Sequence, residues 1–305
     1  MITEQQLSTW ANVPVATRYI HTHKQIREAL DKYISHVVSK NHNYSIESSD
    51  CEIYLQGSYA NSTNIKVDSD VDVVIQLEKS FSYDINHLSE IEKEVFKISY
   101  DSSEYDFHKF KKDVHEVLEM YFDTSIKFDN KSLKVPANTY RVNADVVPAF
   151  KHKKYERFIS LNNKSYIPGI KLFNSGTREV IINYPKEHLK NCSSLNDRTN
   201  GKFKSVVRIF KNMKKKLLQD MKIEKDSAPS YFVENLVYNS PIEIFNGSYQ
   251  DMLIKIIRNW SNDIKNENIK NYECANGQDM LFSDKMWDLE NTYKFIIAIA
   301  DFCND

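Results

Sequence analysis

Apolar residues recur along this chain at two spacings, which predict a mixed first half and a helical second half. In the segments that we assign to helices, apolar side chains fall three or four positions apart and so share one face. Before residue 185, such helices are predicted at 15–39, 87–98 and 106–121. Shorter runs that alternate, or that are rich in Val and Ile, predict strands at 51–55, 70–77, 125–128, 132–135, 140–147 and, in two pieces, 166–183.

Loops and turns are predicted between these elements. Residues 78–86 are expected to form a loop, and Pro148 is expected to end the strand that precedes it. Beyond Pro185 the pattern contains only helices, at 186–191, 202–219, 229–239, 249–265 and 279–302. We therefore predict an α+β fold with two domains. One is a mixed-sheet core at 1–185 that an N-terminal helix braces, and the other is a helical lobe at 186–305.

Composition narrows the class of protein. The chain has 305 residues, of which 41% are hydrophobic and 27% charged, as in ordinary globular proteins. No apolar run approaches the ~20 residues that span a bilayer, and no signal-peptide pattern is present, so we expect a cytoplasmic protein without a membrane partner. The four cysteines are scattered, so neither a zinc site nor a disulfide framework is predicted. A net charge of −1 argues against a protein that coats nucleic acid.

Two carboxylates in the strand at 70–77 point to chemistry. Asp70 and Asp72 are two residues apart, so a strand places both side chains on one face, roughly 7 Å apart. Neighbouring acids repel one another unless a cation lies between them, and a divalent ion is the usual one. Eleven residues separate these acids from Gly57-Ser58, a pair that lets the backbone and a hydroxyl approach a phosphate closely. The hypothesis is a Mg²⁺ site that handles nucleotide phosphates.

A third carboxylate, Asp145, lies in the apolar strand at 140–147. A charge in such a place needs a partner. One interpretation is an acid that is satisfied by a nearby Lys or Arg. The other is a triad, in which Asp70, Asp72 and Asp145 meet and hold two Mg²⁺ ions about 4 Å apart. In that triad Asp145 is a general base or a ligand of the ion that activates an acceptor hydroxyl, and phosphoryl transfer follows from positioning and charge neutralisation.

These motifs resemble those of a known family. The stretch GSYANST at 57–63, followed by SDVDVV at 69–74, is similar to the signature of polymerase-β-like nucleotidyltransferases. More narrowly, it resembles the bacterial CD-NTases, relatives of cyclic GMP-AMP synthase and oligoadenylate synthetase that make cyclic nucleotide signals in anti-phage (CBASS) defence. The resemblance implies an active site in the cleft between core and lobe, and two Mg²⁺ ions, with Mn²⁺ as an alternative. It also implies nucleoside triphosphate substrates (ATP, GTP, UTP or CTP) and a downstream effector of the cyclic product.

The resemblance extends to the helical lobe. The basic helix at 202–216 and the Pro-Ser-Tyr helix start at 229–231 match family features. By this resemblance Lys211 contacts the donor triphosphate as a point charge, and Ser230 contacts it through its hydroxyl and the helix N-terminus. Lys204 is a further candidate for the phosphates. Without the resemblance, the Lys-rich helix is simply a solvated charged face.

The residues that read the bases are less well marked. Tyr231 can stack on a base or pack in the core, and Asn183 can bind a base edge or serve as an ordinary strand-edge residue. No zinc insertion or strongly basic surface is present, so long nucleic acid is not expected as an activator. We expect a monomer. The sequence does not specify the triphosphates, the ring size or the linkage.

Two rival functions stay open at this point. The first keeps the chemistry but changes the acceptor: a nucleotidyltransferase that acts on RNA, tRNA or protein, or that makes linear oligonucleotides. The second is an inactive nucleotide-sensing subunit on the same fold, which loss of an acid would favour. All three acids are present, which argues against the inactive subunit. The resemblance makes an Mg²⁺-dependent cyclic oligonucleotide synthase the leading prediction.

Overall fold

The computed structural model describes residues 2–14, 18–66, 70–103, 105–224, 227–283 and 287–304. The chain forms two compact units whose segments alternate along the sequence. The sheet unit comprises residues 16–56 and 68–185, and the helical unit comprises residues 1–15, 57–67 and 186–305. The segment 57–67 thus belongs to the helical unit, although in the sequence it comes between strands β1 (Cys51–Gln56) and β2 (Val71–Asp84) of the sheet unit. The division into folding domains at residue 185 stays a prediction.

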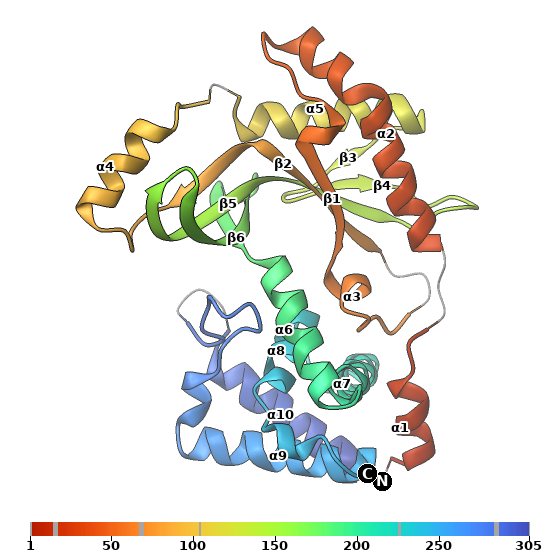
Figure 1. The fold of residues 1–305 in the computed structure, drawn as a ribbon. Coiled ribbons are helices and arrows are strands. Elements are labelled where there is room, and N and C mark those ends of the chain that lie inside the picture. Colours follow the sequence, from red (N-terminus) through yellow and green to blue (C-terminus); the bar gives the residue numbers. More distant parts are fainter. Residues whose placement is uncertain are drawn as a thin grey trace. The chain divides into compact units, whose positions relative to one another are not determined.

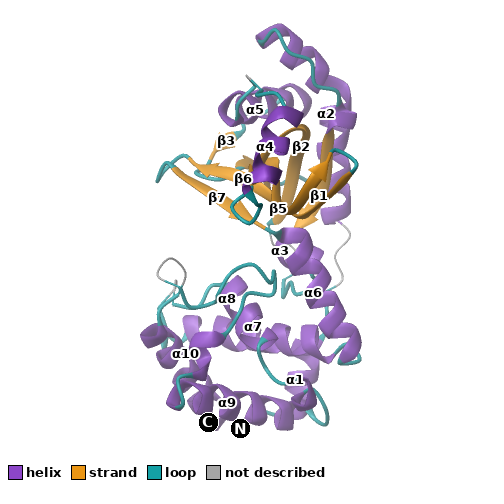
Figure 2. Cartoon of the chain, turned by 60° about the vertical axis from the view of Figure 1, so that its left-hand side comes forward, coloured by secondary structure: helices purple, strands orange, loops and turns teal. Residues whose placement is uncertain are grey.

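One seven-stranded mixed sheet organises the sheet unit (Figures 1 and 2). Its strands are β1 (Cys51–Gln56), β2 (Val71–Asp84), β3 (Lys127–Phe128), β4 (Leu133–Val135), β5 (Ala144–Ser160), β6 (Asn163–Asn174) and β7 (Glu179–Asn183). The strand order is β1-β2-β5-β4-β3, with β6 paired to β5 and β7 to β6. Strands β2 and β5 are parallel neighbours, and all other pairs are antiparallel.

Helices cover this sheet because its strands carry apolar residues on both faces. The helices of the sheet unit are α2 (Arg18–Asn41), α4 (Glu90–Ser99) and α5 (Phe107–Phe122), with a 3-10 turn at Ser48–Asp50. Helices α2 and α5 pack on one another, α2 also contacts β1 and β2, and α4 contacts β5. Val71, Val73 and Ile75 are fully buried, so the face of β2 that they share lies in the core. On the other face, Val74 and Val147 belong to a second apolar cluster.

Two boundaries that the sequence predicts within the sheet are wrong. Strand β2 continues to Asp84 in place of the loop at 78–86, because a bulge between Leu77 and Phe81 takes up the extra residues and pairing with β5 then resumes. Pro148 does not end β5. It lies opposite Ile75 at a point where neither β4 nor β6 pairs with β5, so its missing N–H removes no hydrogen bond on that side.

Helices of the helical unit place fully buried aromatic rings in its core. Its helices are α1 (Glu4–Ala11), α3 (Gly57–Ala60), α6 (Pro185–Arg198), α7 (Lys202–Gln219), α8 (Ser230–Tyr238), α9 (Tyr249–Lys265) and α10 (Leu289–Asn304), with 3-10 turns at Ile242–Ile244 and Asn268–Asn271. Phe210 of α7, Phe232 of α8 and Trp260 of α9 are fully buried in its core. The predicted helices at 202–219 and 249–265 are confirmed without change.

Other helix boundaries differ from the prediction. Helix α1 lies in a stretch without a predicted element, and its N-cap Thr3 accepts a hydrogen bond from the Gln6 N–H. The helix predicted at 279–302 begins only at Leu289, and residues 284–286 within it lie outside the described residues, as do residues 15–17 at the predicted start of α2. Within the described part of the chain, every helix is too short or too polar to cross a bilayer.

Candidate active site

The three predicted acids come together at the start of the parallel strands β2 and β5. Asp72 is the register partner of Asp145. Side chains at paired positions point to the same face of the sheet, and neighbouring strands lie about 4.8 Å apart. Asp70 directly precedes β2, and its charge reaches the carboxylate of Asp72. Asp72 and Asp145 lie 73 residues apart in the sequence, and the pairing of β2 with β5 brings them side by side.

Gln56 and Lys134 extend these acids into a row across four strands. Gln56 of β1 is the register partner of Asp72, and Lys134 of β4 is the register partner of Asp145. The ammonium of Lys134 lies 2.8 Å from Asp145 Oδ1. This ion pair agrees with the first interpretation of Asp145, in which a nearby Lys or Arg neutralises the acid. The neighbouring Asp70 and Asp72 supply what the triad interpretation requires.

Asn143 fixes the orientation of Asp70. Its Nδ2 donates to Asp70 Oδ1 at 3.1 Å, while its Oδ1 accepts from the Ala137 N–H at 2.7 Å. Because the amide is held from both ends, Asp70 keeps a defined direction even though it precedes the strand. Asn143 therefore supports an acid of the row.

The pKa of Asp72 is perturbed by its position in the row. Burial, then the charges of Asp145 and Asp70, raise the pKa of Asp72 to about 6, against a smaller opposing effect of Lys134. On the other side of the row, the hydrogen bond to Asp145 raises the pKa of Lys134. Such a perturbed carboxylate is typical of a functional site, because an enzyme can exploit the destabilised charge by binding a cation there.

The chemistry of this row fits a divalent metal ion. Carboxylate and amide oxygens are the hard ligands that Mg²⁺ prefers. Gln56 Oε1 is buried and has no hydrogen-bond partner within the described residues. An unpaired buried acceptor costs free energy, and a bound cation or its water ligand would satisfy it. Asp70, Asp72 and Asp145, with Gln56 beside them, are therefore the residues that would hold the ion.

Gly57 and Ser58 open the short helix α3 and do not form a simple turn. Gly57 has φ = +68°, a left-handed conformation that glycine adopts without strain. The Thr63 N–H donates to the Ser58 carbonyl at 2.8 Å and closes the segment on itself. Gly57 is exposed and Ser58 half-buried, so solvent reaches the pair.

Lys211 and Lys204 both have protein partners. Lys211 is only 5% exposed, and its ammonium donates to the Thr63 carbonyl at 2.7 Å. Burial lowers the pKa of Lys211 to about 8. The ammonium of Lys204 donates to Ser193 Oγ at 3.1 Å. The phosphate contacts of both lysines stay predictions.

The remaining candidates lie in different places. Ser230 is exposed as the first residue of α8, while the ring of Tyr231 stacks on His188 with centroids 5.0 Å apart. Asn183 ends β7, and its Oδ1 accepts from the next backbone N–H, that of Tyr184. By strand register, Asn183 aligns with a position six residues beyond Asp145 on β5, about 20 Å along the strand. The structure thus does not bring Asn183 beside the acids, and base recognition by Tyr231 or Asn183 stays a prediction.

Two residues of the row, Lys134 and Gln56, are not marked by any pattern in the sequence. Lys134 alternates with buried residues in a short strand, but only strand register pairs it with Asp145. Gln56 directly precedes the Gly-Ser pair, and nothing in the neighbouring sequence indicates that it pairs with Asp72. Glu234 is different, because a lone acid inside the apolar helix α8 is a visible signal of a buried polar contact.

A mixed sheet with clustered acids, joined to a helical unit, is the architecture of a nucleotidyltransferase, and the comparisons with known proteins agree. A family model for the nucleotidyltransferase domain matches residues 38–167. A second model, for the cGAS/DncV-like nucleotidyltransferase C-terminal helical domain, matches residues 190–304. The cyclic nucleotide synthase CdnE01 of Staphylococcus haemolyticus is 37% identical over 286 residues, which cover 92% of this chain and 93% of that protein. The chain belongs to the CD-NTase family.

Solved structures support the same assignment. The Rhodothermus marinus CdnE c-UMP-AMP synthase, solved with Apcpp and Upnpp, has a TM-score of 0.83 at 34% identity, with 100% of this chain and 97% of that chain covered. The Elizabethkingia meningoseptica CdnE cyclic dinucleotide synthase, solved with GTP and Apcpp, has a TM-score of 0.79 at 28% identity, with both chains fully covered (100%). The predicted family, fold class and enzymatic nature are confirmed. Nucleotidyltransferases of this kind normally use divalent metal ions.

Proposed function

We propose that this chain joins nucleoside triphosphates into a cyclic di- or trinucleotide and releases one pyrophosphate for each bond formed. The observation that carries the proposal is the register of Asp72 with Asp145 beside Asp70, in a chain whose relatives are named cyclic nucleotide synthases. The relatives differ in the nucleotides that their names record, so the choice of triphosphate is left to the experiment below.

Each acid has a proposed role in this reaction. Asp70, Asp72 and Asp145 would hold two Mg²⁺ ions, and Asp145, on the acceptor side, would serve as a ligand or general base. The ions, when bound, supply charge neutralisation for the triphosphate and lower the pKa of the acceptor hydroxyl. Asn143 keeps Asp70 aimed at the site, and Lys134 pairs with the carboxylate of Asp145.

The helical unit supplies the proposed phosphate contacts. Ser58 and Ser230 both present hydroxyls that solvent reaches, and we propose that they bind the donor triphosphate. We propose that Lys211 also contacts the donor triphosphate. One of the three N–H donors of its ammonium binds the Thr63 carbonyl, so Lys211 supports the segment that carries Ser58 as well. Lys204 is a further proposed phosphate contact.

The proposed product is a signal for a downstream effector in anti-phage defence. A cyclic nucleotide resists phosphatases because it has no terminal phosphate, which suits a diffusible messenger. We further propose that the enzyme acts as a monomer and needs no long nucleic acid. Light scattering of the purified chain, and activity assays with and without double-stranded DNA, test these two points.

The decisive experiment incubates the purified chain with labelled ATP, GTP, CTP and UTP and either Mg²⁺ or Mn²⁺. Phosphatase treatment removes linear triphosphates, and mass spectrometry identifies the remaining product. The expected result is a phosphatase-resistant product whose mass gives the nucleotides and the ring size. The double variant Asp70→Asn/Asp72→Asn serves as the control and should make none. Product formation by this variant would overturn the metal assignment.

The same assay separates the rival functions. A phosphatase-sensitive ladder would indicate a linear oligonucleotide synthetase. Label transferred only to added RNA or protein would indicate a macromolecular acceptor. Binding of triphosphates without any product or transfer would indicate a nucleotide-sensing subunit. Each of these outcomes contradicts the proposed cyclisation.

A further inference from the structure

The chain just beyond the Gly-Ser pair is held by an unusual concentration of buried charge. Three consecutive residues, Asn61 to Thr63, contact three charged side chains of the helical unit: Arg208, Lys211 and Glu234. These three side chains are between 5% and 6% exposed. We call this arrangement the 61–63 clamp. All of its members belong to the helical unit.

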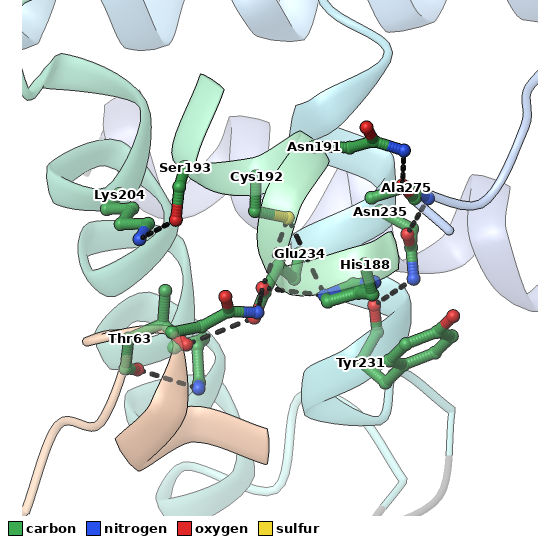
Figure 3. A network of polar contacts seen from close by, with 12 residues as sticks. Thr63, His188, Asn191, Cys192, Ser193, Lys204, Tyr231, Glu234, Asn235 and Ala275 are labelled. Atoms are coloured by element: carbon green, nitrogen blue, oxygen red, sulfur yellow. Dashed lines mark hydrogen bonds and ion pairs between the residues drawn. The ribbon is translucent and has the colours of Figure 1, made fainter. Parts of the chain in front are cut away.

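Glu234 holds two side chains of the clamp. Its Oε1 accepts from Asn61 Nδ2 at 2.6 Å, and its Oε2 accepts from Thr63 Oγ1 at 3.0 Å. The His188 ring adds a third contact, with Nε2 at 3.0 Å from Glu234 Oε1 (Figure 3). A buried carboxylate needs such partners, because an unpaired charge in the interior costs several kcal/mol.

The two cations hold the backbone of the same segment. Arg208 donates to the Ser62 carbonyl at 2.5 Å, and Lys211 donates to the Thr63 carbonyl at 2.7 Å. Ser62 has φ = +54°, a left-handed conformation that a non-glycine residue adopts only at a cost. Such a conformation persists where the surroundings fix it, and the clamp provides that fixation.

The neighbours of Glu234 favour its ionised form. Burial by itself would raise the pKa of Glu234, but the hydrogen bond and charge of His188, followed by Lys211 and Thr63, outweigh it and lower the pKa. A charged Glu234 forms stronger hydrogen bonds to Asn61 and Thr63 than a neutral one would.

A metal site is the other interpretation of part of this network. Ligand atoms of His188, Cys192 and Glu234 lie within 4.8 Å of one another. However, both oxygens of Glu234 already accept hydrogen bonds, and the nearby ammonium of Lys211 opposes a bound cation. Burial raises the pKa of the Cys192 thiol, which disfavours the thiolate that a metal needs. The hydrogen-bonded clamp is therefore the better interpretation.

The clamp connects directly to the Gly-Ser pair. The Asn61 N–H donates to the Gly57 carbonyl at 3.1 Å, and the Thr63 N–H donates to the Ser58 carbonyl at 2.8 Å. We propose that Glu234 is a positioning residue, which fixes Gly57 and Ser58 for triphosphate binding through Asn61 and Thr63. This proposal rests on the proposed function, in which Ser58 contacts the donor triphosphate.

A pair of matched threonine variants tests the proposal. Thr63→Val removes the hydroxyl that donates to Glu234 and keeps the shape of the side chain. Thr292→Val makes the same change at a buried threonine of the helical unit, on α10, whose hydroxyl donates to the Asp288 carbonyl at 2.8 Å, and this helix carries no member of the clamp. Asn61→Ala removes the other donor to Glu234, and it gives an independent test if Thr63→Val does not fold.

Two measurements read the effect. Hydrogen–deuterium exchange of the peptide 57–63 should be about tenfold faster in Thr63→Val than in wild type, because one hydrogen bond to a charged acceptor is lost. The KM for the donor triphosphate should rise about tenfold with a much smaller change in kcat, since the loss concerns binding geometry. Thr292→Val should change neither quantity. Equal behaviour of the two valine variants in exchange and KM would overturn the proposal.

The exchange measurement keeps this proposal separate from the proposed function. If wild type makes no product, the proposed function fails, and calorimetric titration with a non-hydrolysable ATP analogue then replaces KM. Faster exchange together with weaker analogue binding in Thr63→Val would still support the positioning role. Unchanged exchange and unchanged binding would reject it, whether or not wild type is active.

Discussion

Replacing Asp72 by Asn should stabilise the metal-free protein while it abolishes activity. Burial, with repulsion from Asp145 and Asp70, raises the pKa of Asp72 from 3.8 to about 6. One pKa unit corresponds to 1.36 kcal/mol, so an ionised Asp72 lowers the free energy of unfolding by up to about 3 kcal/mol above pH 6. Asn has the same shape without the charge. The variant should therefore gain most of that amount at pH 7.5 in EDTA.

The sign of the pH dependence follows from the raised pKa. The folded protein binds a proton on Asp72 more tightly than the unfolded chain does, so the penalty is absent below pH 3.8 and grows as pH rises through 6. The advantage of Asp72→Asn should accordingly be roughly half as large at pH 5 as at pH 7.5. Urea unfolding of both proteins in EDTA at the two pH values measures it. Adding Mn²⁺ should stabilise wild type and leave the variant almost unchanged.

A buried acid with a full set of partners provides the control. Asp113 is fully buried and accepts hydrogen bonds from Tyr105 at 2.5 Å and Asn41 at 2.9 Å. Asp113→Asn should therefore destabilise the protein, opposite in sign to Asp72→Asn. The reasoning about Asp72 would be refuted if Asp72→Asn were less stable than wild type in EDTA at pH 7.5. It would also be refuted if the difference did not shrink at pH 5.

Three further predictions concern the row of acids and the core. Lys134→Met should tighten Mn²⁺ binding several-fold in calorimetry, because it removes a cation that competes for Asp145; weaker binding would contradict this. Gln56→Leu should stabilise the metal-free protein by about 1 kcal/mol in urea unfolding, since it removes a buried acceptor without a partner, and it should weaken Mn²⁺ binding. Trp260→Ala should cost about 3–5 kcal/mol through loss of a fully buried ring. Trp260→Phe should cost less than about 1.5 kcal/mol because the buried indole N–H has no partner, and equal costs for the two would speak against this account.

Local patterns predicted an element well where the residues of that element alone determine its structure. The helices at 202–219 and 249–265 carry a strong apolar face, and their bounds match the structure. Two wrong boundaries in the sheet have one cause. The polar residues at 78–84 and Pro148 argue locally against a strand, yet pairing between β2 and β5 holds both in the sheet.

The sequence determined the acids and the family, because the Asp-x-Asp spacing and the Gly-Ser pair are local features of one short stretch, residues 57–72. The sequence could not determine which distant side chains pair with one another. Lys134 meets Asp145 through strand register, and Glu234 meets Thr63 across 171 residues of chain. Only the tertiary structure decided that Lys211 bonds to the Thr63 carbonyl and that the Gly-Ser segment joins the helical unit. The physical reason is that hydrogen bonds and charge pairs between distant segments depend on how those segments pack, and a local pattern does not encode that packing.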